Sequence, residues 1–136
     1  MIRIYENQAG KFSVNEFGAF HADDGEPAIV YSNGAKYYFK MGRLHNDNGP
    51  AIVTRIGSEM WYYYGFQHRT NGPAVVYKNR QNCTPRICWF LCGRQFASQD
   101  AYFKALKKLK KQGPEFLFTG EIAMRLKTLN VNIKWG

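Results

Sequence analysis

Three histidines recur along this 136-residue chain, each a few residues ahead of a proline and an alanine: His21, His45 and His68. An imidazole can act as a general acid or base near neutral pH, so these residues could serve an enzyme that acts on a phosphate-bearing substrate. None of the three has a nucleophile or a paired carboxylate that distinguishes it from the other copies. A polar side chain that returns at one place in every repeat usually ties a connection to its neighbour's backbone. We therefore expect a structural role for the histidines and no catalytic residue, and the enzyme is the least favoured of three functions.

Three cysteines follow in the third repeat. Cys83, Cys88 and Cys92 cannot all pair, and the even spacing of Cys88 and Cys92 in one predicted strand is a poor geometry for a disulfide. Reduced thiols are the simplest interpretation. A zinc site made from these cysteines and His68 is the alternative, but the chain has no Cys-x-x-Cys pair. The sequence therefore predicts neither a metal nor a cofactor.

A strongly basic segment ends the chain. The net charge is +9, and residues 101–136 hold eight of the 19 Lys and Arg residues against two of the ten acids. In a helix over residues 99–112, four lysines lie opposite an apolar face that contains Tyr102, Leu106 and Leu109; they are Lys104, Lys107, Lys108 and Lys111. This lysine face is either a solvated surface, which we favour, or a surface for the phosphates of nucleic acid or an acidic membrane.

Tyrosines and arginines form another group of candidate binding residues. Residues 61–64 read Trp-Tyr-Tyr-Tyr in a predicted strand, so alternate side chains face opposite sides and half of them are exposed. Tyr, Trp and Arg dominate protein-binding hot spots, and the same rings could stack on bases. The predicted partner-binding residues are Arg43, Arg69, Arg94, Tyr62, Tyr64, Lys78, Arg80, Lys104, Lys107, Lys108 and Lys111.

The chain is built from a tandem repeat, because Pro27, Pro50 and Pro73 lie 23 residues apart. The units of this repeat position the side chains described above. After each Pro-Ala comes a short β-branched run (residues 28–31, 51–54 and 74–77), then a glycine turn and an aromatic strand (residues 36–41 and 59–64). Each repeat therefore predicts one β-hairpin, and the segment from His to Pro connects it to the next. The third repeat has five extra residues around positions 78–85, an insertion of the kind that often marks a binding loop.

The two ends of the array are predicted to differ from the middle. Residues 2–5 and 12–17 form a degenerate first hairpin, and Ser98 is the N-cap of a helix over residues 99–112 that ends before Gly113-Pro114. This helix covers the last hairpin, and Phe96, which stands where His45 and His68 stand, is expected to be buried beneath it. A second helix over about residues 120–129 and a strand over residues 131–135 follow.

Residues 65–74, Gly-Phe-Gln-His-Arg-Thr-Asn-Gly-Pro-Ala, resemble the MORN-type repeats, and more closely a variant found in small bacteriophage and giant-virus proteins. The second unit keeps His45 and Gly49-Pro50-Ala51 but has Asn46 in place of the arginine, and the last unit has lost the histidine. The resemblance covers about residues 17–100. It implies an elongated antiparallel β-meander used for binding and assigns no ligand and no catalytic residue.

Together these patterns predict a mainly β protein with C-terminal helices, an antiparallel hairpin-repeat meander (residues 1–97) capped by a basic helical region (residues 98–136). No signal peptide or long apolar run is present in the sequence, so a cytoplasmic location is expected, in an infected bacterial host if the protein is viral. The favoured function is a non-enzymatic, phage-type accessory protein that binds and modulates or inhibits a host protein or protein–nucleic-acid complex, as in counter-defence. The alternative is a nucleic-acid-binding protein that uses the lysine face.

Overall fold

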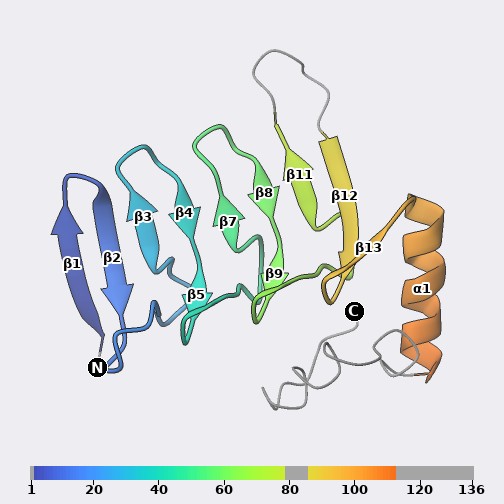
Figure 1. The fold of residues 1–136 in the computed structure, drawn as a ribbon, viewed down its shortest axis with the longest axis horizontal. Coiled ribbons are helices and arrows are strands. Elements are labelled where there is room, and N and C mark those ends of the chain that lie inside the picture. Colours follow the sequence, from blue (N-terminus) through green and yellow to red (C-terminus); the bar gives the residue numbers. More distant parts are fainter. Residues whose placement is uncertain (1, 79–85, 113–136) are drawn as a thin grey trace.

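The computed structural model describes residues 2–78 and 86–112, and its strands form an antiparallel meander with one helix at the C-terminal end (Figure 1). Among the described residues, nine strands join one sheet in the order β1-β2-β3-β4-β7-β8-β11-β12-β13, and β5-β6 and β9-β10 form two small pairs. The predicted fold class is confirmed. The bounds are β1 (Arg3–Asn7), β2 (Gly10–Val14), β3 (Ile29–Tyr31), β4 (Lys36–Tyr37), β5 (Phe39–Lys40), β6 (Arg43–Leu44), β7 (Ile52–Val53), β8 (Glu59–Met60), β9 (Tyr62–Tyr63), β10 (Phe66–Gln67), β11 (Val75–Tyr77), β12 (Arg86–Leu91), β13 (Arg94–Phe96) and α1 (Gln99–Gln112).

The hairpins β3–β4 and β7–β8 form where the repeat predicts them. Their turns contain Gly34 and Gly57, with φ of 96° and 88°, a conformation that costs glycine little and other residues much. The side-chain oxygen of Asn33 accepts the backbone N–H of Ala35 at 2.9 Å and closes the first of these turns. The predicted N-terminal hairpin is present as β1–β2, with a shorter turn than expected because Asn7 pairs directly with Gly10.

The predicted aromatic strands are each interrupted at one residue, and this differs from the expectation of continuous strands. Tyr38 separates β4 from β5, and Trp61 separates β8 from β9. The N–H of Tyr38 bonds to the carbonyl of Ala51 in the large sheet, whereas its own carbonyl accepts the N–H of His45 in the small pair. Trp61 makes the same two bonds, to Ala74 and His68. The chain therefore changes partners at these residues and starts a second hairpin.

The second hairpins replace the simple connections that the sequence predicts. β5–β6, β9–β10 and β12–β13 each turn through a non-glycine residue and a glycine, and both have positive φ in all three turns. The values are 50° and 81° at Met41-Gly42, 46° and 88° at Tyr64-Gly65, and 46° and 86° at Cys92-Gly93. Two consecutive left-handed residues are the requirement of a type I′ turn, so each repeat contributes two stacked hairpins.

The large sheet has two different faces. Residues that are opposite in register point to the same side, so Phe12, Ile29, Tyr37, Ile52, Met60 and Val75 share one face. Tyr31 lies two residues after Ile29 in β3, and Tyr77 lies two residues after Val75 in β11, so both belong to this face as well. We call this the tyrosine face. The other face carries Lys11, Val30, Lys36, Val53, Glu59 and Val76, where charged residues alternate with valines.

α1 closes the C-terminal end of the sheet, with the bounds that the sequence predicts. Ser98 caps it, since its hydroxyl accepts the N–H of Ala101 at 3.1 Å. The apolar face of the helix packs with the end of β12 into a core of Leu91, Cys92, Tyr102, Ala105, Leu106 and Leu109. Burial raises the pKa of the Cys92 thiol, which therefore stays protonated at neutral pH.

Tyr102 rather than Phe96 is the central residue under the cap. Tyr102 is 0% exposed, and its hydroxyl donates to the carbonyl oxygen of Arg69 in the preceding repeat. Phe96 is only half-buried and lies at the edge of the cluster, with ring centroids 6.3 Å from Tyr102. Phe96 therefore packs against the core under the helix, as expected, but it is only partly buried there.

Several predicted elements lie outside the described residues: the inserted loop after Lys78, the helix over residues 120–129 and the strand over residues 131–135. Within the described part, no helix has both the length and the apolar composition that a membrane crossing requires. All five residues of β1 are exposed, so the N-terminal edge of the sheet has no cover comparable with α1 in the described chain.

Candidate binding groove

The three repeat histidines join one repeat to the next. Nδ1 of His21 accepts the N–H of Met41 at 3.1 Å, Nδ1 of His45 accepts that of Tyr64 at 3.1 Å, and Nδ1 of His68 accepts that of Cys92 at 2.9 Å. Each donor is the first left-handed residue of the next small hairpin. An acceptor at this position must be unprotonated, so the contact selects the imidazole tautomer with its proton on Nε2.

The other ring nitrogen is also engaged in the first two copies. Nε2 lies 2.9 Å from the carboxylate of Asp23 in His21 and 2.9 Å from that of Asp47 in His45. His45 and His68 are only 4% and 6% exposed. The three imidazoles accept backbone N–H groups in an exposed place at His21, a partly buried one at His45 and a buried one at His68, which is the structural role expected from their recurrence.

The predicted arginines have two different roles. Arg69 is engaged within the chain: it donates to the carbonyl of Pro73 at 3.1 Å and to Asn71 at 2.9 Å, and its guanidinium lies 4.0 Å from the ring centroid of Trp61. Asn46, the equivalent residue of the previous repeat, makes the corresponding bond to Pro50 at 3.0 Å. Arg69 thus braces the Gly-Pro loop, and burial lowers its pKa.

Arg43 and Arg94, in contrast, are both exposed. They follow the glycines of equivalent turns, in β6 and β13.

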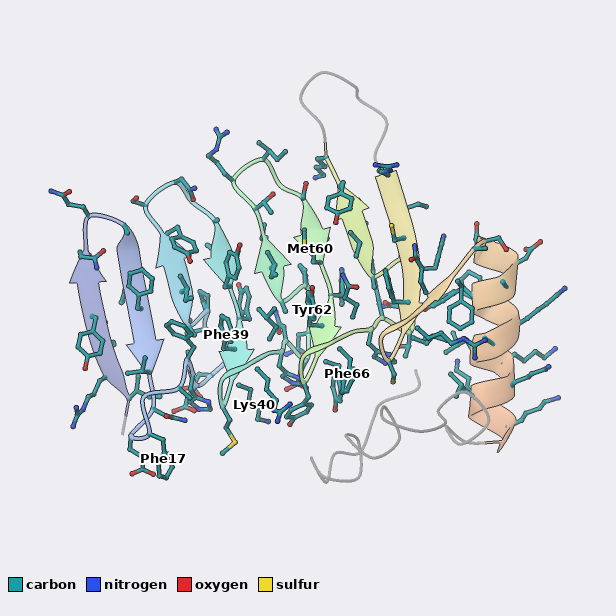
Figure 2. All side chains as sticks on the ribbon, in the orientation of Figure 1. Phe17, Phe39, Lys40, Met60, Tyr62 and Phe66 are labelled. Atoms are coloured by element: carbon teal, nitrogen blue, oxygen red, sulfur yellow. The ribbon has the colours of Figure 1, made fainter. Side chains whose placement is uncertain are left out.

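Tyr62 and Tyr64 do not share a surface. Tyr64 lies in the β9–β10 turn, where its ring packs on His45 with centroids 4.2 Å apart, and a hydrogen bond with its hydroxyl raises the pKa of Lys40. Tyr62 lies on β9 of the small β9–β10 pair, two residues after Met60 on β8 of the large sheet (Figure 2). Burial raises its pKa, and the nearby phenols of Tyr77 and Tyr37 raise it further. Both tyrosines therefore belong to the small β9–β10 hairpin, Tyr62 near Tyr37 and Tyr77 of the tyrosine face and Tyr64 against His45 of the preceding repeat.

The four predicted lysines of α1, Lys104, Lys107, Lys108 and Lys111, are all exposed. Their helix, α1, lies at the C-terminal end of the sheet, beyond β12 and β13 (Figure 1). Of the two predicted loop cations, Lys78 lies on the tyrosine side of the sheet at the end of β11, and Arg80 lies outside the described residues. The predicted set is therefore distributed over at least three surfaces.

A groove of about 560 Å³ occupies the tyrosine face near the β3–β4 and β7–β8 turns. Three tyrosines, one methionine and one isoleucine provide its apolar surface, and two cations stand among them. Its lining residues are Tyr31, Asn33, Ala35, Tyr37, Thr54, Arg55, Ile56, Ser58, Met60, Tyr77 and Lys78. Tyr31 and Tyr37 hold each other edge-to-face with centroids 5.4 Å apart, and Phe12 packs edge-to-face on Tyr31 at 5.9 Å. Such ring pairs make a preformed wall.

The side-chain oxygens of Asn33, Thr54 and Ser58 in the groove already accept hydrogen bonds from the backbone. Thr54 Oγ1 accepts the N–H of Ser58 at 3.0 Å, and Ser58 Oγ accepts the N–H of Lys78 at 2.8 Å. The amide oxygen of Asn33 is used in its own turn. The groove therefore offers an incoming molecule ring faces, methyl groups, a thioether, three tyrosine hydroxyls and two cations.

A smaller hollow of about 220 Å³ lies beside the small hairpins, away from these turns. The His21–Asp23 and His45–Asp47 pairs line it together with Asp24, Glu26 and Lys40. Its carboxylates outnumber its cations, so its charge is opposite to that of the groove. Within the described ranges, no cluster of three or more His, Cys, Asp or Glu side chains is suited to a metal ion, and Cys83 of the considered zinc site lies outside them.

The sequence interpretation missed Tyr31, Tyr37 and Tyr77. The signal was available, because Tyr31 and Tyr77 are the last residues of equivalent apolar runs, but register was needed to bring Tyr37 beside them. Comparison with protein-family models, with curated proteins and with solved structures gives no match for this chain.

Proposed function

We propose that this protein is a non-enzymatic binding protein whose tyrosine face holds a segment of a protein partner. The single observation that supports this most is the groove, which combines aromatic walls with Arg55 and Lys78 in a preformed concavity of about 560 Å³. Concave, mostly apolar surfaces with a few fixed polar groups are typical binding sites, and Tyr and Arg are the residues that contribute most to protein interfaces.

The groove favours protein over nucleic acid as the partner. A base is read through hydrogen bonds to its edge, and the oxygens of Thr54, Ser58 and Asn33 already accept such bonds from the backbone, which leaves the tyrosine hydroxyls, Arg55 and Lys78 for that purpose. The lysine face, the surface most suited to phosphates, lies on α1 and contributes no residue to the groove. Nucleic-acid binding through that face is the second candidate.

A viral origin and a host target follow only from the resemblance of residues 17–100 to the MORN-variant repeats of bacteriophage and giant-virus proteins. On that basis the partner is a host macromolecular complex, and the binding modulates or inhibits it, in the cytoplasm of the infected bacterium. The phosphate-substrate enzyme has less support, because the imidazoles it would use bond to backbone N–H groups at 2.9 to 3.1 Å.

Capture from a bacterial lysate tests the groove directly. We expect the wild-type chain to retain a protein partner after nuclease treatment and Tyr77→Ala to lose roughly nine-tenths of it, since an interface tyrosine contributes about 1 to 2 kcal/mol or more. Tyr5→Ala is the matched control, because Tyr5 is 54% exposed, compared with 42% for Tyr77, and does not line the groove. Loss of all captured protein on nuclease treatment would instead favour the nucleic-acid function.

The lysine face is expected to affect the rate at which the partner associates more than the rate at which it dissociates. Reversing the charge of Lys104, Lys107, Lys108 and Lys111 should slow association with an acidic partner by roughly tenfold and reduce its dependence on salt, while dissociation changes little. All four side chains are exposed. Surface plasmon resonance at two salt concentrations measures both rates. Complete loss of binding at both concentrations would make the lysine face the primary site.

A further inference from the structure

The groove exists because one repeat lacks a tyrosine. Positions 31, 54 and 77 are equivalent, 23 residues apart, and they hold Tyr31, Thr54 and Tyr77. Thr54 thus leaves a recess on the tyrosine face between two repeats that fill the same place with a ring. With strands about 4.8 Å apart and two strands per repeat, each flanking tyrosine begins about 10 Å from Thr54. We call this recess the Thr54 slot.

The protein itself shows what fits such a place. In the preceding repeat, the ring of Tyr31 packs edge-to-face on Tyr37, with centroids 5.4 Å apart and planes at 83°. The residue equivalent to Tyr37 in the slot is Met60, which lines the groove and is half-buried. A ring above Met60 would have a thioether beneath it and tyrosines at both sides, and sulfur–aromatic contacts are favourable. The slot is therefore shaped for one aromatic ring that the chain does not supply from its own repeat.

The charge around the slot indicates what accompanies that ring. Arg55 and Lys78 line the groove, and among the residues that the structure describes no carboxylate lies within ion-pair distance of either. The sequence has no Asp or Glu between Glu59 and Asp100, so the third repeat is basic throughout. Oppositely charged groups on a partner would be steered to this rim and held there.

We propose that the Thr54 slot is the anchor site for a single aromatic side chain in an acidic segment of the partner protein. The ring takes the place of the missing repeat tyrosine, above Met60, and the flanking carboxylates pair with Arg55 and Lys78. The inference rests on the proposed function, because it specifies which chemistry the groove of that binding protein recognises.

The test uses the whole chain and defined probes. An acetylated, amidated pentapeptide Glu-Asp-Trp-Asp-Glu is titrated by NMR, beside the same peptide with Ala for Trp, one with Lys for every acid, and a thymidine hexanucleotide. We expect a Kd on the order of 1 mM for the first peptide, with shifts at the groove residues, and binding weaker by roughly tenfold or more for the other two peptides.

Two substitutions of Thr54 distinguish the effect of filling the slot from the effect of losing the threonine hydroxyl. Thr54→Tyr fills the slot with the residue that Tyr31 and Tyr77 already place in this fold, and we expect it to weaken the peptide by roughly tenfold or more. Thr54→Val loses the same hydroxyl, which accepts the N–H of Ser58, but leaves the slot open, so its affinity for the peptide should stay within about twofold of wild type. Arg55→Glu should weaken binding by roughly fivefold, more at low salt than at high salt.

Equal binding by wild type and Thr54→Tyr, or equal loss with Thr54→Val, would overturn the proposal. Tighter binding of the hexanucleotide than of the peptide, abolished by Thr54→Tyr, would also overturn it and make the slot a base-stacking site. Failure here is distinguishable from failure of the proposed function. If Tyr77→Ala loses the lysate protein but Thr54→Tyr retains it, the tyrosine face still binds protein and only the slot is wrong.

Discussion

Tyr102→Ala is expected to lower the free energy of unfolding by about 3 to 5 kcal/mol, the range for removing a large buried aromatic side chain. Tyr102 is 0% exposed, and its ring centroid lies 4.9 Å from that of Trp89 in the last long strand. The substitution empties the middle of the core that joins α1 to the sheet. It also leaves the carbonyl of Arg69 without its tyrosine donor, which couples the cap to the preceding repeat. Urea denaturation followed by circular dichroism measures the change.

Two control variants show how much of this loss of stability comes from the buried ring and how much from the hydroxyl of Tyr102. Phe103→Ala removes a neighbouring ring that is 43% exposed, and we expect it to cost less than about 1 kcal/mol. Tyr102→Phe keeps the ring and removes only the hydroxyl, for a loss of about 1 kcal/mol. If Tyr102→Ala were no more destabilising than Phe103→Ala, α1 would not be the structural cap of the sheet.

His68→Ala is expected to lower the free energy of unfolding by about 2 to 4 kcal/mol, because it combines a cavity with an unsatisfied buried donor. The N–H of Cys92 loses its acceptor, which lies 2.9 Å away in a buried environment. Cys92 is 1% exposed, so water reaches this donor poorly. His68→Asn returns an acceptor oxygen near the Nδ1 position and should recover part of the stability. Thermal unfolding of the three proteins tests this.

His21→Ala is the matched control, because it removes the equivalent hydrogen bond near the N-terminal end of the array. The N–H of Met41 that His21 accepts is exposed, and water can replace the imidazole there. We expect a loss of about 1 kcal/mol or less. Equal losses for His21→Ala and His68→Ala would mean that burial does not set the value of this repeated contact.

The two stability predictions and the Thr54 slot have a common basis. Each repeat contributes the same set of bonds, and the value of one copy depends on what its neighbours place around it. His68 lies beneath the capped end and His21 near the open one, and Thr54 stands between two tyrosines. The same repeat position therefore has a structural role in one copy and can have a binding role in another.

The sequence by itself determined the repeat, the hairpins at Gly34 and Gly57, and the helix with its cap at Ser98. These features depend on interactions between residues close in the chain: left-handed turns that favour glycine, a capping hydroxyl, and an apolar period of 3.6 residues. The histidines could also be interpreted correctly, because recurrence at one repeat position indicates a shared structural contact.

Only the tertiary structure decided which side chains gather into a site. Tyr31 and Tyr37 meet because β3 and β4 pair in one register, and Tyr62 and Tyr64 separate because Tyr62 lies in β9 and Tyr64 is the left-handed residue of the following turn. Arg69 braces its own Gly-Pro loop against Trp61, a contact that the sequence interpretation did not include. These outcomes depend on strand register and on contacts between successive repeats. A pattern of residue types along the chain does not specify such contacts, because a shift of register by one residue would move every side chain to the other face.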